Sequence, residues 1–148
     1  MRQNAVGNLQ PGEYEKTRNF GAKLAIGEYP AVLVRWEQTQ AKSGAYYQVI
    51  NFESCADATQ RGAEASLWIL LAIGGDPRKD SFNGMGLYLK LLKAIDKSPE
   101  VAFDTEDCIG SAVHITITQA GFVERIQSPT DAEDALAVNY WVAQHPEQ

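Results

Sequence analysis

Two runs of β-branched and aromatic residues with a short polar segment between them constrain the fold of this chain most strongly. The runs are EYPAVLVRWEQ (28–38) and AYYQVINFE (45–53), and the segment between them is TQAKSG. In the second run, alternate residues would lie on opposite faces of a strand. One face would carry Tyr46, Gln48, Ile50 and Phe52, and the other face Tyr47, Val49 and Asn51. This is the two-residue period of a strand, and Gly44 suits a tight turn. The pattern predicts a β-hairpin.

Three further segments predict the remaining regular structure. AEASLWILLAI (63–73) alternates weakly, with Ala65, Leu67, Ile69 and Leu71 opposite Glu64, Ser66 and Trp68. Its Ala, Glu and Leu also favour a helix, so both alternatives stay open, although flanking glycines fit a strand. SFNGMGLYLKLLKAIDKSPE (81–100) has leucines at helical spacing, Ser81 or Asn83 as a cap and Pro99 as a stop. IGSAVHITITQ and FVERIQ, joined by Ala120-Gly121, predict two more strands.

The order strand, strand, strand, helix, strand, strand is that of a five-stranded oligonucleotide/oligosaccharide-binding barrel (OB-fold). With 148 residues, 45% of them apolar, the chain has the size and composition of one globular domain, and the five strands make the predicted fold mainly β. We expect an extended N-terminal arm over 1–26, the barrel over 27–128 and an acidic C-terminal tail over 129–148. No apolar run long enough for a membrane span and no secretory signal is visible, so we expect a cytoplasmic protein without membrane contact.

The charge distribution argues against one class of function. A net charge of -6 excludes a uniformly basic surface for duplex nucleic acid, but it leaves room for a local groove. The charge is also polarised, because the first 23 residues are slightly basic and the last 18 contain acidic residues and no Lys or Arg.

Signals for an enzyme are weak. Cys55 and Cys108 lack metal-ligand spacing, so we interpret both as buried, inert thiols. His114 falls on the outward face of a strand, where a plain surface histidine is the default. Asp104, Glu106 and Asp107 look like a cap and turn before a strand rather than metal ligands. We therefore expect no enzymatic activity, no catalytic residues, no cofactor and no metal, with a hydrolase holding a metal by carboxylates as a remote alternative.

Three stretches carry a resemblance to a known family. GEYPAVLVRWEQTQAKSGAYYQVINFE, GLYLKLLKAID and FDTEDCIGSAVHITIT resemble the opening hairpin, central helix and fourth strand of small phage and prophage proteins related to single-stranded DNA-binding proteins. The likeness covers roughly residues 27–127 and departs from the usual pattern in having Ser111, not Lys, after Gly110. It implies an OB-fold that coats single-stranded DNA during replication or recombination, in the host cell cytoplasm if phage-encoded.

Binding a single strand needs ring faces for base stacking and cations for phosphates. The candidates for this DNA-binding role are Arg35, Trp36, Lys42, Tyr46, Tyr47, Arg61, Trp68 and Arg125. Phe122 is a further aromatic candidate, but we assign Tyr46, Phe52 and Phe122 mainly to the core. Trp36 shares parity with Val32 and Val34 and is expected to be at least half buried. Two alternatives remain open for Trp68: it is either an exposed platform for base stacking or a core residue packed under the helix.

The C-terminal segment predicts a partner-binding role. Its candidate residues are Asp131, Glu133, Asp134, Tyr140 and Trp141, which would recruit replication or recombination proteins. A short amphipathic helix that docks Leu136, Tyr140 and Trp141 on the barrel or on a neighbouring subunit is the alternative. We also expect a homo-oligomer. The competing function is a protein-interaction module, either a virion component or a host-directed inhibitor, on the same barrel.

Overall fold

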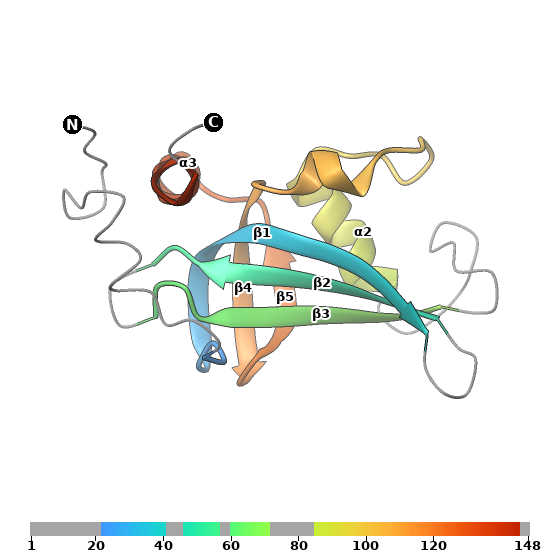
Figure 1. The fold of residues 1–148 in the computed structure, drawn as a ribbon, viewed down its shortest axis with the longest axis horizontal. Coiled ribbons are helices and arrows are strands. Elements are labelled where there is room, and N and C mark those ends of the chain that lie inside the picture. The colour runs from blue at the N-terminus through green and yellow to red at the C-terminus, as the bar shows by residue number, and fades with distance from the viewer. Residues whose placement is uncertain (1–21, 41–45, 57–59, 72–84, 146–148) are drawn as a thin grey trace.

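The computed structural model of the protein describes residues 22–40, 46–56, 60–71 and 85–145 (Figure 1). The predictions for Lys42, Gly44, Ser81 and Asn83 lie outside these residues. The elements are β1 (Gly27–Gln40), β2 (Tyr46–Ser54), β3 (Glu64–Leu71), α2 (Met85–Ala94), the short 3-10 helix η1 (Thr105–Cys108), β4 (Ala112–Gln119), β5 (Phe122–Gln127) and α3 (Asp131–Gln144). The predicted mainly β fold with five strands is confirmed, and α3 is added to it.

The five strands form one sheet that closes on itself. β1 pairs antiparallel with β2 and with β4, β2 pairs with β3, and β4 pairs with β5. β3 and β5 complete the ring through one parallel register pair, Ser66 with Phe122. Figure 1 shows the long strands β1, β2 and β3 running side by side in front of β4 and β5.

Within the predicted segment 63–73, residues Glu64–Leu71 form the strand β3, which decides between strand and helix for the described part. Its odd-numbered residues Ala65, Leu67 and Ile69 are buried in the main core, whereas Trp68 is exposed. A helix would have spread these apolar side chains around its axis, but a strand sends all of them to one face. The alternation therefore outweighed the helix propensity of Ala, Glu and Leu.

β1 contains a bulge that changes the predicted orientation of Trp36. The register against β2 shifts between Leu33 and Arg35. An extra residue in one strand reverses the inward and outward parity beyond it. Val32 consequently belongs to a second cluster beneath α3, while Trp36 packs against the main core. The prediction that these two residues share one face of the strand is therefore wrong.

α2 packs against β5 and covers one end of the core with Tyr88, Leu91 and Leu92. The helix ends earlier than Pro99, because Asp96 adopts a left-handed conformation with φ 60°. The Lys97 amide then donates to the Leu92 carbonyl at 2.8 Å, closing a Schellman-type cap.

Described residues on both sides of the predicted barrel pack against its strands, namely residues 22–24 before β1 and α3 after β5. Leu24 is fully buried, and its amide donates to the Glu64 carbonyl at 2.8 Å. At the other end, α3 packs against β1 and β4 through a cluster of Val32, Cys55, Ala137, Tyr140 and Ala143. None of the helices in the described ranges has the length and apolar character needed to cross a membrane.

Candidate nucleic-acid interface

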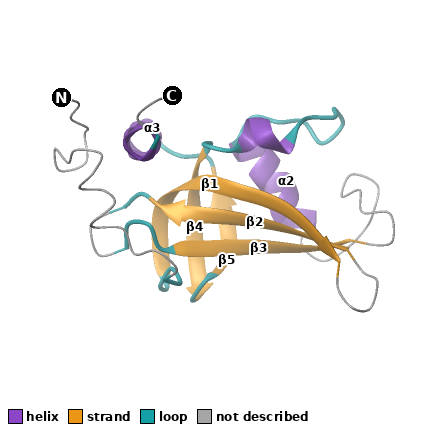
Figure 2. Ribbon diagram, in the orientation of Figure 1, coloured by secondary structure: helices purple, strands orange, loops and turns teal. Residues whose placement is uncertain are grey.

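One row of residues crosses the outer face of the sheet in register. Arg35 on β1 lies opposite Asn51 on β2, Asn51 lies opposite Ser66 on β3, and Ser66 lies opposite Phe122 on β5. The inward neighbours of this row fill the core, so these side chains face away from it. Figure 2 shows that no described helix or loop covers the side of β2 and β3 that faces the viewer.

A groove of about 340 Å³ follows this row. Its lining residues are Ala22, Lys23, Arg35, Asn51, Glu64, Ser66, Trp68, Gly121 and Phe122. They come from β1, β2, β3, the start of β5 and the segment before β1. The groove is therefore a product of the closed sheet, and no single stretch of sequence encodes it.

Two aromatic rings of the groove neighbour Ser66, namely Phe122 opposite it on β5 and Trp68 two residues further along β3. Trp68 is 49% exposed and Phe122 is 44% exposed, which is high for residues of this size. Tyr47 contacts Trp68 edge to face, with ring centroids 5.8 Å apart. Trp68 is thus exposed on the sheet rather than packed under α2. The assignment of Phe122 to the core was wrong, because β5 begins at Phe122 and its inward position is Val123.

The floor of the groove beside the rings is polar. The Ser66 hydroxyl donates to Oδ1 of Asn51 at 2.6 Å, which fixes both side chains in the groove. Amide and hydroxyl groups held this way can exchange hydrogen bonds with the edge of a planar ligand. Neither Asn51 nor Ser66 was predicted as a binding residue from the sequence. The alternation could have indicated them, because Asn51 lies on the same strand face as Tyr47 and Ser66 on the same face as Trp68.

The charged groups of the groove are two cations and one carboxylate. Arg35 reaches across β2 and forms an ion pair with Glu64 on β3, through Nη2 and Oε1. Lys23 lies beside Gly121, where an added Cβ would be 3.2 Å from the Lys23 methylene groups. Lys23 and Glu64 were not predicted as site residues, since Lys23 was assigned to the N-terminal arm.

The other predicted DNA-binding residues do not join this groove. Arg61 is 3% exposed, so its assignment to a phosphate-binding surface is corrected to a buried position. Trp36 contacts Tyr88 and Phe103 edge to face, and its Nε1 donates to Gln48 Oε1. Arg125 is exposed on β5 opposite Thr116 and does not line the groove. The side chain of Tyr46 lies outside the described residues.

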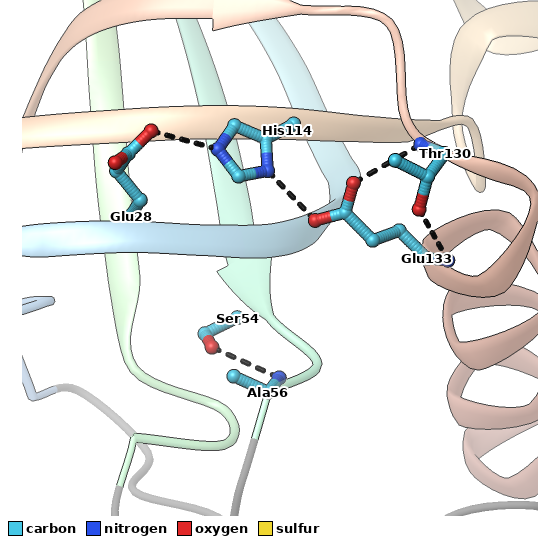
Figure 3. Close-up of polar contacts among 6 residues, drawn as sticks. All are labelled: Glu28, Ser54, Ala56, His114, Thr130 and Glu133. Atoms are coloured by element: carbon cyan, nitrogen blue, oxygen red, sulfur yellow. Dashed lines mark hydrogen bonds and ion pairs between the residues drawn. The ribbon is translucent and has the colours of Figure 1, made fainter.

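His114 on β4 links two other elements, as Figure 3 shows. Its Nδ1 lies 2.7 Å from Oε2 of Glu133 on α3, and its Nε2 lies 3.1 Å from Oε1 of Glu28 on β1. The sequence predicted a plain surface histidine here. The predicted position on the outward face is right, but the ring is held between two carboxylates.

These contacts shift the pKa values of His114 and Glu133. Partial burial would lower the pKa of His114, but hydrogen bonds to Glu133 and Glu28 outweigh it and raise the pKa above its ordinary value. Partial burial would raise the pKa of Glu133, but hydrogen bonds from the Thr130 backbone and His114 lower it. The protonated ring and the ionised carboxylate thus stabilise each other.

α3 gives a structural role to several predicted partner-binding residues. Glu133 completes a capping box, since the Thr130 amide donates to its carboxylate and its own amide donates to Thr130 Oγ1 (Figure 3). Asp131 and Asp134 are exposed in the first turn, where carboxylates favour the positive end of the helix dipole. Of the two alternatives for this segment, the helix docked on the sheet is the one observed.

Tyr140 anchors this helix. Its ring is 1% exposed, and its hydroxyl donates to Oε1 of the buried Glu53 at 2.5 Å. A partner cannot reach this ring while α3 is docked, so its predicted partner-binding role is corrected to packing. Trp141 stacks on His145 with centroids 3.8 Å apart and lines a smaller cavity of about 230 Å³ that Arg35 also borders.

The outer face of β2 and β3 therefore combines exposed rings, a hydrogen-bonding floor and cations at its edges. This arrangement can hold a planar, anionic ligand. Comparison of the sequence with models of protein families and with curated proteins gives no match.

Proposed function

We propose that this protein binds single-stranded DNA non-catalytically in the groove on β2 and β3. The single observation that carries the proposal is the pair of exposed rings, Trp68 and Phe122, that line one groove with the polar pair Asn51 and Ser66 and the cations Arg35 and Lys23. Unpaired bases present ring faces and edges that match these groups, and their phosphates match the cations.

We also propose that the closed sheet is an OB-fold. Three features support this assignment: the pairing order β1-β2-β3-β5-β4, the parallel contact of β3 with β5, and α2 between β3 and β4 in the chain. OB-folds bind oligonucleotides on the face of their second and third strands. The groove lies on that face, which makes the fold and the proposed ligand consistent.

A role in coating DNA during phage replication or recombination follows from the family resemblance of the sequence. Such a role requires binding with little sequence preference. Stacking supplies about 1 to 3 kcal/mol per base whatever the base, because every base has a ring face. The rings in the groove, rather than its hydrogen-bonding floor, would then supply most of the affinity.

Fluorescence titration with an oligothymidylate tests the proposal. We expect quenching of Trp68 on binding, with an affinity that falls as salt rises. In a Trp68→Phe variant, a labelled oligothymidylate should still bind by anisotropy while the quenching is largely lost. If the wild-type protein gives neither quenching nor an anisotropy change at low salt, it does not bind single strands in this groove.

The charge balance of the groove favours one competing function, a protein-interaction module on the same face. With two cations against one carboxylate, the groove is less basic than a phosphate-binding surface usually is. A protein ligand would bury Trp68 and Phe122 without a steep salt dependence. Absence of oligonucleotide binding would favour this alternative.

A further inference from the structure

We infer that Glu64 is a selectivity residue that makes the groove reject anionic ligands lacking exposed rings. The inference rests on the proposed function and concerns the ion pair of Glu64 with Arg35. That ion pair lies inside the groove, since both residues line it together with Trp68 and Phe122.

The position of Arg35 makes it the natural phosphate ligand of the groove. It stands at one end of the row Arg35, Asn51, Ser66 and Phe122, and its ion pair with Glu64 brings its guanidinium across β2 to β3, the strand that carries Trp68. The side chain remains 46% exposed and therefore accessible. Its planar guanidinium can donate two parallel hydrogen bonds to a phosphate as readily as to a carboxylate.

Glu64 occupies this ligand position when the groove is empty. It comes from β3, two residues before Ser66, and its side chain is about half as exposed as that of Arg35, at 24%. The backbone of Glu64 is fixed by hydrogen bonds with Ala22 and Leu24, so the carboxylate cannot move far from the groove. A phosphate must therefore exchange with the carboxylate at Arg35 and then remain close to its negative charge.

This exchange weakens phosphate binding and leaves base stacking unaffected. The repulsion is larger for a duplex, which carries roughly twice the charge per unit length of one strand. A duplex or a polysulfate also offers no free ring faces to Trp68 and Phe122, so stacking does not offset the repulsion. Discrimination of this kind acts by disfavouring the wrong ligand rather than by adding contacts to the right one. Glu64 would thus lower the affinity for all polyanions but raise the preference for single strands.

The matched variants are Glu64→Gln and Glu124→Gln, which remove the same charge. Glu124 is exposed on β5 and does not line the groove. The probes are an oligothymidylate and a duplex of equal length, measured by anisotropy over a range of salt concentrations. We expect Glu64→Gln to bind the oligothymidylate about fivefold more tightly, as expected for removal of one charge near a phosphate. Its plot of log affinity against log salt should steepen by about 0.7 as Arg35 gains a phosphate.

In Glu64→Gln, the affinity for the duplex should rise by a larger factor than the affinity for the single strand. In Glu124→Gln, the slope of log affinity against log salt should match that of the wild type. The effect of Glu64→Gln should also shrink in an Arg35→Gln background, because the two residues act through one ion pair. Thermal unfolding of every variant establishes that it is folded.

Unchanged or weaker binding by folded Glu64→Gln, with normal binding by the wild type, would overturn this inference alone and make Glu64 a residue that merely positions Arg35. Lack of binding by both proteins would remove the proposed function and this inference with it.

Discussion

His114 on β4 and Glu133 in the first turn of α3 are joined by a 2.7 Å contact between Nδ1 and Oε2, and they lie 19 positions apart in the sequence. The same carboxylate accepts a hydrogen bond from the Thr130 amide through its other oxygen. Glu133 therefore caps its own helix and ties that helix to the sheet. The protonation of one imidazole is thereby linked to the docking of α3.

This link predicts a stability that depends on pH. The pKa of His114 is raised in the folded state, so its contribution is complete below the ordinary value of 6.5 and is lost as pH rises through the folded pKa. The pKa of Glu133 is lowered, so its contribution is complete above 4.5 and is lost as pH falls through the folded pKa. We expect the largest contribution between these values, amounting to roughly 1 kcal/mol after solvent screening.

Urea unfolding at pH 5.5 and pH 8 measures this effect, with His114→Gln as the control. The variant should lose the part of the pH dependence that belongs to His114, because glutamine does not titrate. Glu28 on β1 also contacts the ring, but its side chain is 66% exposed and should contribute less, so Glu28→Gln should behave nearly as the wild type does. Identical pH profiles for His114→Gln and the wild type would contradict the link.

Tyr140 should be the main anchor of α3. Truncation to Ala empties a fully packed site and should lower the free energy of unfolding by about 3 to 5 kcal/mol. Tyr140→Phe keeps the ring but removes the hydroxyl donor from the buried Glu53 carboxylate, and should lower it by about 1 to 3 kcal/mol.

Cys55 gives a direct measurement of that docking. Both thiols are buried as predicted, and burial raises the pKa of Cys55 to about 12 and raises the pKa of Cys108 as well. Cys55 lies in the cluster under α3, whereas Cys108 lies in the main core. Tyr140→Ala should therefore speed thiol labelling of Cys55 much more than that of Cys108. Equal acceleration at both thiols would indicate global unfolding instead of release of the helix.

Trp68 should contribute to binding and little to stability. Trp68→Ala removes a half-exposed ring, so we expect oligothymidylate affinity to fall by about 1 to 3 kcal/mol per lost stack, roughly 5- to 150-fold. Trp36 provides the contrast, because its ring packs at the core edge against Tyr88 and Phe103. Trp36→Ala should mainly lower the melting temperature. A reversal of these two effects would place the binding surface on the α2 side.

Two glycines should respond oppositely to alanine. Gly86 lies in α2, and a Cβ there would meet nothing within 4 Å, so Gly86→Ala should stabilise the protein by about 0.5 to 1 kcal/mol. Gly121 has φ +83°, and a Cβ there would lie 3.2 Å from the Lys23 side chain. Gly121→Ala should destabilise by about 1 kcal/mol or more and weaken oligonucleotide binding, since it strains the groove wall. Thermal unfolding and anisotropy check both variants.

The sequence predicted the strands and the central helix well because alternation and helical spacing are local properties. The exposed face of β2 and β3 follows from that alternation, and Trp68 could be considered a platform on the same basis. Failures occurred where a position depends on distant segments. Phe122 faces the groove only because β5 meets β3, and the partners of His114 lie 19 and 86 positions away. The bulge before Arg35 has no clear signature in its sequence, so parity alone put Trp36 on the face of Val32, although the expected burial of at least half of its side chain is right.

The contact between β3 and β5 is short, and the segment before β1 completes it. Leu24 is inserted there, receiving a hydrogen bond from the Gly121 amide at 2.9 Å and donating one to the Glu64 carbonyl. Residues separated by about a hundred positions must therefore meet before the ring of strands is sealed, and loop closure on that scale slows folding. We expect the amides of Leu24 and Gly121 to gain protection from hydrogen exchange last during refolding, as the early part of the chain joins the late part.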